Sequence, residues 1–140
     1  MKDTEFKGHI GKTIYESEAS WPVENKAPDA APNIIIALLD DVGFSQLGCY
    51  GSTIKTPNID TLADNGLRYN NFHTTAMCSP TRASLLTGRN HHTTGMGAIA
   101  EWSTGFPGYS GQISKRTSTL AEILKPHGYN SFAIGKWHLM

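Results

Sequence analysis

Residues 33–43 read NIIIALLDDVG, and this segment determines the predicted fold class. A continuous uncharged run, rich in β-branched side chains, ends abruptly in two aspartates. Such a run is typical of a strand buried on both faces, as in a parallel sheet covered by helices. The segment therefore predicts an α/β fold with polar side chains at the carboxyl end of this strand.

Helix and strand signals alternate along the chain that follows. Capping hydroxyls and prolines near the starts, and glycines at the ends, mark three helices. Two short segments rich in apolar and aromatic side chains are typical of strands. The predicted order is a helix at 56–66, a strand at 67–72, helices at 78–88 and 119–128, and a strand at 129–135. We therefore expect a mostly parallel sheet flanked by helices.

Two other segments lack such periodicity. Residues 1–32 contain several prolines and no sustained helical or strand period, and we interpret them as an amino-terminal arm. Residues 33–140 then form the body of the domain. Within it, residues 89–116 are rich in glycine and are predicted to form a long ordered loop, a kind of segment that often carries function.

The composition excludes several classes of protein. The chain has 140 residues, about one domain, and no apolar run long enough to span a membrane. Twelve Lys and Arg residues balance twelve Asp and Glu residues, so we expect neither nucleic acid nor a membrane as partner. No apolar segment follows the first residues as in a signal peptide, which favours a cytoplasmic location. Cys49 and Cys78 are too few for a disulfide framework, and a single bridge between them stays open.

Asp40 and Asp41 are candidate metal ligands at the end of the first predicted strand. Adjacent carboxylates suit a hard divalent cation, since Ca²⁺ and Mg²⁺ take oxygen ligands and the cation offsets the repulsion between the acids. A solvated turn or a helix cap is the alternative for an isolated Asp-Asp pair.

Lys136 and His138 follow the last predicted strand, two residues apart. If the extended backbone persists, both side chains point to one side and Trp137 points to the other. A lysine supplies a positive charge for a tetrahedral anion, and a histidine accepts a proton near neutral pH. The alternative for this pair taken alone is two solvent-exposed side chains without a functional role.

Residues 78–82 read CSPTR and stand at the start of a predicted helix. There a cysteine meets free backbone N–H groups and the positive end of the helix dipole, which favour a polarised or anionic group. Arg82, four residues on, lies on the same helix face and can reach back toward Cys78. The alternative is a buried structural thiol.

The segment CSPTR, followed by LTGR at 86–89, resembles the signature of the type I sulfatases of the alkaline phosphatase superfamily. The long loop, at 90–97 and 101–105, is most similar to that of the bacterial arylsulfatases. Other amino-terminal blocks of the family match in order and spacing at residues 33–43, 56–63 and 135–139.

The resemblance implies that a separate formylglycine-generating enzyme oxidises Cys78 to formylglycine. Its hydrated aldehyde would be the nucleophile that attacks sulfur, and its second hydroxyl would allow sulfate to be expelled. Asp40, Asp41 and the modified Cys78 would be ligands of Ca²⁺, with Mg²⁺ also possible.

Three further roles follow from the resemblance. Arg82 would hold the modified residue, Lys136 would bridge it to the sulfate, and His138 would hydrogen-bond the diol and assist release of the product. The expected reaction is hydrolysis of a small-molecule sulfate ester, with an aryl sulfate giving a phenol and inorganic sulfate.

Sulfatase catalytic domains are several times longer than this chain, so the resemblance identifies residues 33–140 as the amino-terminal part of such a domain. Calcium takes roughly six to eight oxygens, more than two carboxylates and the modified residue supply. We therefore expect activity to need the downstream region and these residues alone to be inactive. Two alternatives stay open: a phosphonate or phosphate ester hydrolase of the same superfamily, and a catalytically inactive binding fragment.

Overall fold

The computed structural model describes residues 6–22 and 25–140. Three α-helices and five short 3-10 helices form within these residues, and no helix among them is long and apolar enough to cross a membrane. In chain order the elements are η1 (Ile14–Glu16), η2 (Phe44–Gln46), η3 (Gly48–Tyr50), α1 (Pro57–Asn65), α2 (Cys78–Thr87), η4 (Ala100–Trp102), α3 (Leu120–Leu124) and η5 (Lys125–His127).

The chain divides into two compact units. One unit, here the arm unit, combines the described residues up to Ala31 with Ala121–Ser131. The other, here the site unit, combines Pro32–Leu120 with Phe132–Met140 and contains every candidate site residue. Of the predicted arm at 1–32, residues 1–5 and 23–24 lie outside the described part of the chain.

The predicted helices are confirmed, because local signals set their ends. Helix α1 begins at Pro57, where proline lacks only an N–H that the first turn does not use, and it ends before Gly66. Helix α2 begins at Cys78 and ends at Gly88, whose φ of 64° is the left-handed conformation that glycine adopts without strain. The third helix is shorter than predicted, since Pro126 falls in the 3-10 turn that follows α3.

The predicted sheet is not seen in the described residues. Their only β-bridge is an isolated antiparallel pair, between His9 and Glu18. Residues 33–39 run without helix or ladder, and Ile35 is 91% exposed instead of buried. A strand is stable only with hydrogen bonds to a neighbour, and no described segment supplies that ladder to residues 33–39, 67–72 or 129–135.

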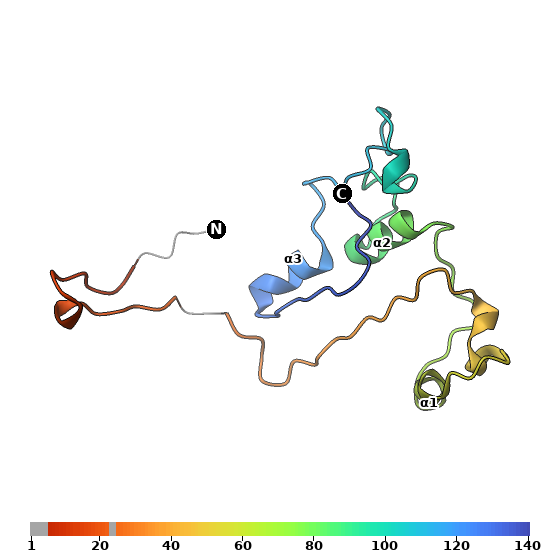
Figure 1. The fold of residues 1–140 in the computed structure, drawn as a ribbon, viewed down its shortest axis with the longest axis horizontal. Coiled ribbons are helices and arrows are strands. Elements are labelled where there is room, and N and C mark those ends of the chain that lie inside the picture. The colour runs from red at the N-terminus through yellow and green to blue at the C-terminus, as the bar shows by residue number, and fades with distance from the viewer. Residues whose placement is uncertain (1–5, 23–24) are drawn as a thin grey trace. The chain divides into compact units, whose positions relative to one another are not determined.

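The core of the site unit joins α2, the long loop and the end of the chain. Ala83, Met96, Ala100 and Leu139 are buried against one another, with Leu86 and Ile113 packed beside them. The loop at 89–116 is ordered as predicted, because its backbone folds on itself through bonds such as Gly97 N–H to the Gly108 carbonyl at 2.7 Å. Leu139 is 4% exposed and packs in the same cluster as Ala83 of α2, and the C-terminal segment passes beside α2 (Figure 1).

Candidate active site

Asp40 joins two cations from distant parts of the sequence. Lys136 Nζ donates to its Oδ2 at 2.8 Å, and Arg82 Nη2 donates to its Oδ1 at 3.3 Å. Lys136 and Asp40 are each partly exposed, whereas the Arg82 side chain is only 12% exposed. Three segments that are far apart in the sequence thus meet at one carboxylate.

These contacts shift the pKa values of the pair in opposite directions. The hydrogen bond from Lys136 lowers the pKa of Asp40 most, and Arg82 lowers it further. The hydrogen bond to Asp40 raises the pKa of Lys136. Both groups therefore stay charged across the neutral pH range, and the site keeps a carboxylate between two cations.

Arg82 lies on α2 and lines the cavity of the site. One turn after Cys78, its Nη1 donates to the backbone carbonyl of Lys136 at 2.5 Å. Its Nε is buried and has no hydrogen-bond partner among the described residues. A buried donor of this kind suits an additional oxygen acceptor, such as an oxygen of a bound anion or of a modified neighbouring side chain.

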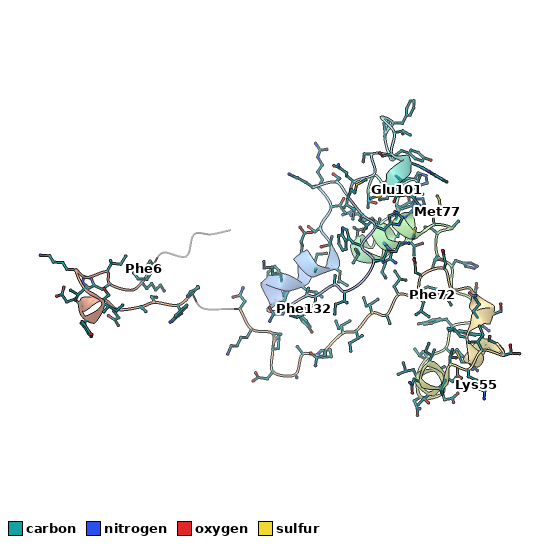
Figure 2. The ribbon with its side chains drawn as sticks, viewed as in Figure 1. Phe6, Lys55, Phe72, Met77, Glu101 and Phe132 are labelled. Carbon is teal, nitrogen blue, oxygen red and sulfur yellow. The ribbon has the colours of Figure 1, made fainter. Side chains whose placement is uncertain are left out.

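A second line of contacts runs from Cys78 through His138 to Glu101. Cys78 Sγ lies 3.0 Å from His138 Nδ1, and both Glu101 carboxylate oxygens lie within hydrogen-bond distance of His138 Nε2, at 2.7 and 2.8 Å. In Figure 2, Glu101 lies on the loop that follows α2, and Met77 marks the residue just before Cys78. The first residue of α2, the end of the chain and η4 thus converge.

The extended backbone on which the expected alternation of side chains at 136–138 depends is not present. Gly135 has a φ of 97° and His138 a φ of 53°, so the backbone is not extended there. Trp137 stays half exposed. The left-handed turn at His138 directs its ring to Cys78, whereas Lys136 reaches Asp40. Both residues still meet the site, by a different backbone path from the one predicted.

Asp40, Asp41, Cys78 and Arg82 line one cavity of about 470 Å³. Asp41 has a left-handed backbone conformation, with a φ of 54°, and lines the cavity next to Asp40. Within the described residues, no three His, Cys, Asp or Glu side chains gather into a set that could hold a metal ion. The two carboxylates fit one side of a site for a hard divalent cation, which takes roughly six to eight oxygens when it is Ca²⁺.

The structure therefore brings the predicted site residues together. Arg82 and Lys136 both contact the Asp40 carboxylate. His138 contacts the Cys78 thiol. Asp41 lines the cavity that Asp40, Cys78 and Arg82 also line. Sequence reasoning assigned no role to Glu101, which no spacing links to His138, 37 residues away. One sequence feature could have drawn attention to it: Glu101 is the single acidic residue of the loop at 89–116.

Other polar residues of the long loop serve its own structure. His91 Nδ1 lies 2.9 Å from the carbonyl of Met96, and His92 Nε2 lies 3.1 Å from the Tyr109 hydroxyl. Both histidines are therefore engaged by partners within the loop itself. Cys49 and Cys78 are both free thiols, so the possible bridge between them is not formed.

The sequence model of the Sulfatase family matches residues 32–140. The chain belongs to the sulfatase family. This sulfatase sequence is 43% identical over 122 residues to an uncharacterized sulfatase of Schizosaccharomyces pombe, covering 81% of this chain and 22% of that protein.

Relatives with named activities have similar sequence identity to this chain and similar coverage. An arylsulfatase of Klebsiella aerogenes is 37% identical over 115 residues, covering 81% of this chain and 25% of the relative. The steryl-sulfatase of Homo sapiens is 42% identical over 125 residues, covering 85% of this chain and 21% of the relative. The sulfatase chain described here thus spans about a fifth to a quarter of the length of these relatives.

Proposed function

We propose that the full-length protein hydrolyses sulfate esters, with an aryl sulfate giving a phenol and inorganic sulfate. The observation that carries the proposal is the placement of Cys78, the first residue of α2, in one cavity with Asp40, Asp41 and Arg82. That cavity combines a nucleophile position, two carboxylates for a cation and a buried guanidinium. Membership of the sulfatase family supports the same reaction.

The proposed site uses Cys78 after its conversion to formylglycine by a separate enzyme. An oxygen of the modified, hydrated side chain would take the place of Cys78 Sγ, the atom that lies 3.0 Å from His138 Nδ1. When present, the modified residue supplies the nucleophilic oxygen, and a divalent cation, Ca²⁺ or Mg²⁺, polarises the ester. Asp40, Asp41 and residue 78 are the proposed ligands of that cation.

The cationic side chains would stabilise the anion. Arg82 and Lys136 flank the Asp40 carboxylate at 3.3 and 2.8 Å and so place two positive charges beside the cavity. A group that gains negative charge on its oxygens is stabilised most by charges fixed in advance. Arg82 is the more rigid of the two, because it is mostly buried and also bonds the Lys136 carbonyl.

His138 would move the proton at residue 78. Its Nδ1 lies 3.0 Å from Cys78 Sγ, within the reach that general acid–base catalysis requires. With Nε2 hydrogen-bonded to Glu101, Nδ1 is the nitrogen free to accept a proton from residue 78 and return it later in the cycle.

Turnover of paired substrates tests the proposal against the related ester hydrolases. The full-length protein, purified after co-expression with a formylglycine-generating enzyme, is assayed with one aryl group carried as sulfate, phosphate monoester and phenylphosphonate ester. We expect kcat/KM to be highest for the sulfate. A higher kcat/KM for the phosphonate or the phosphate would identify a phosphonate or phosphate ester hydrolase, and no turnover of any of them would favour a binding role.

The 140 residues by themselves are expected to hydrolyse no aryl sulfate. They provide two carboxylates for the cation, and loss of even one positioned general acid or base costs about 10²–10⁴-fold. We also expect low solubility, because apolar side chains such as Ile35, Phe132 and Ile134 are almost fully exposed.

This expectation is tested by expressing residues 1–140 with the converting enzyme, adding Ca²⁺ and a chromogenic aryl sulfate, and recording hydrolysis and sedimentation. A soluble monomer with the turnover of the full-length protein would show that the catalytic unit lies within these residues.

A further inference from the structure

Glu101 holds His138 from the side opposite Cys78. The two carboxylate oxygens lie 2.7 and 2.8 Å from His138 Nε2, while Nδ1 of the same ring faces the thiol at 3.0 Å. The Glu101 side chain is 59% exposed, so these contacts, and not packing in the core, are what it contributes. The resulting line of contacts places a carboxylate, an imidazole and the nucleophile position in sequence.

The carboxylate decides which nitrogen of His138 carries the proton. A hydrogen bond with its own backbone and the bond to His138 lower the pKa of Glu101, so the group is ionised at neutral pH. An ionised carboxylate only accepts hydrogen bonds, so His138 Nε2 must be the donor. In a neutral imidazole this leaves Nδ1 unprotonated and able to accept from residue 78.

The neighbours of both residues fix the contact in place. Ala100, next to Glu101, is buried, and its N–H donates to Ser79 Oγ at 3.2 Å, beside Cys78 on α2. Leu139, next to His138, is 4% exposed and packs in the same core. Glu101 and His138 are therefore each adjacent to a residue anchored against α2, and their separation does not depend on a free loop.

We propose that Glu101 is a positioning residue that fixes the ring orientation and the Nε2–H tautomer of His138, so that Nδ1 faces the nucleophile at position 78. The inference rests on the proposed function for its kinetic consequence, but its structural content, the tautomer of His138, does not. Outer-shell carboxylates that orient a functional histidine change activity by about 10–100-fold when they are removed.

The kinetic test uses the full-length protein carrying formylglycine, with Glu101→Ala, the near-isosteric Glu101→Gln, and Glu18→Gln as the matched control on an exposed glutamate of the arm unit. We expect kcat of Glu101→Ala to fall about 10–100-fold with KM little changed. Glu101→Gln should fall less, because its amide oxygen still accepts from Nε2, and Glu18→Gln should match the wild type. Added formate or acetate should partly restore Glu101→Ala, which a merely structural role would not allow.

The second readout is independent of catalysis. In protein labelled with ¹⁵N-histidine, with the His138 signals assigned by their loss in His138→Asn, the ring should be Nε2–H in the wild type and mixed in Glu101→Ala. Wild-type kcat in Glu101→Ala, or a His138 tautomer that is Nδ1–H or unchanged by the substitution, would overturn the inference. If Glu101→Ala does not fold, Glu101→Gln decides by the same criteria. A wild-type protein that turns over no sulfate ester would overturn the proposed function alone, since the tautomer still tests Glu101.

Discussion

Replacing Cys78 by alanine in the full-length protein should reduce hydrolysis of aryl sulfates to the background rate. Cys78 begins α2 and lines the cavity with Asp40 and Asp41, so its loss removes the proposed nucleophile position from the centre of the site. Catalysis through a covalent intermediate at residue 78 is not possible once its side chain lacks a nucleophile. The measurement is kcat for a chromogenic aryl sulfate, with protein from cells that also make the formylglycine-generating enzyme.

Two further variants make the Cys78 result specific. Cys78→Ser should react once and stall as a serine sulfate ester, because a single hydroxyl has no second oxygen from which to expel sulfate. Cys49→Ala is the matched control, since Cys49 is also a free, half-buried thiol and does not line the cavity. Full activity in Cys78→Ala, or equal losses in Cys78→Ala and Cys49→Ala, would remove Cys78 from the mechanism.

Asp40→Asn should produce the second large effect, a fall in kcat/KM of about 10²–10³-fold for an aryl sulfate. Asp40 is the carboxylate shared by Lys136 and Arg82 and a proposed ligand of the cation. An amide in its place keeps the shape but removes the negative charge. Lys136 and Arg82 then lose their ion-pair partner, and the proposed metal ion loses a carboxylate ligand. Calcium binding by the metal-stripped protein, measured by calorimetry, should weaken in the same variant.

Asp64→Asn is the control for this substitution, because Asp64 lies on α1, is exposed and does not line the cavity. Asp41→Asn should weaken calcium binding with a smaller loss of activity, since no cationic side chain among residues 6–22 and 25–140 pairs with Asp41 as Lys136 pairs with Asp40. Calcium binding and kcat/KM in Asp40→Asn that equal those of Asp64→Asn would contradict the proposed role.

The helices were predictable from the sequence because their signals are local. Proline at the start of α1 and Gly88 at the end of α2 act within one turn of the chain, so no distant contact is needed to place these ends. The predicted sheet depends instead on pairing between segments far apart in the sequence. Residues 33–39 have the composition of a buried strand, yet a strand needs a neighbour, and Ile35 stays exposed without one.

The sequence was enough to predict which residues belong to the site, but not the backbone path and contacts that bring them together. The resemblance to sulfatases pointed to Asp40, Asp41, Cys78, Arg82, Lys136 and His138, and the structure brings them into one unit. The path of the backbone at His138 was missed, because a left-handed residue other than glycine leaves no mark in composition or periodicity. Glu101 was missed for a related reason, since its partner is reached only through the folded loop.

The most direct test of the central claim is peptide mass spectrometry of residue 78 in full-length protein whose sulfate ester hydrolysis has been measured on the same sample. Formylglycine at position 78, in a proportion that tracks specific activity across preparations made with and without the converting enzyme, is the predicted result. A fully active preparation in which residue 78 is entirely unmodified cysteine would contradict it.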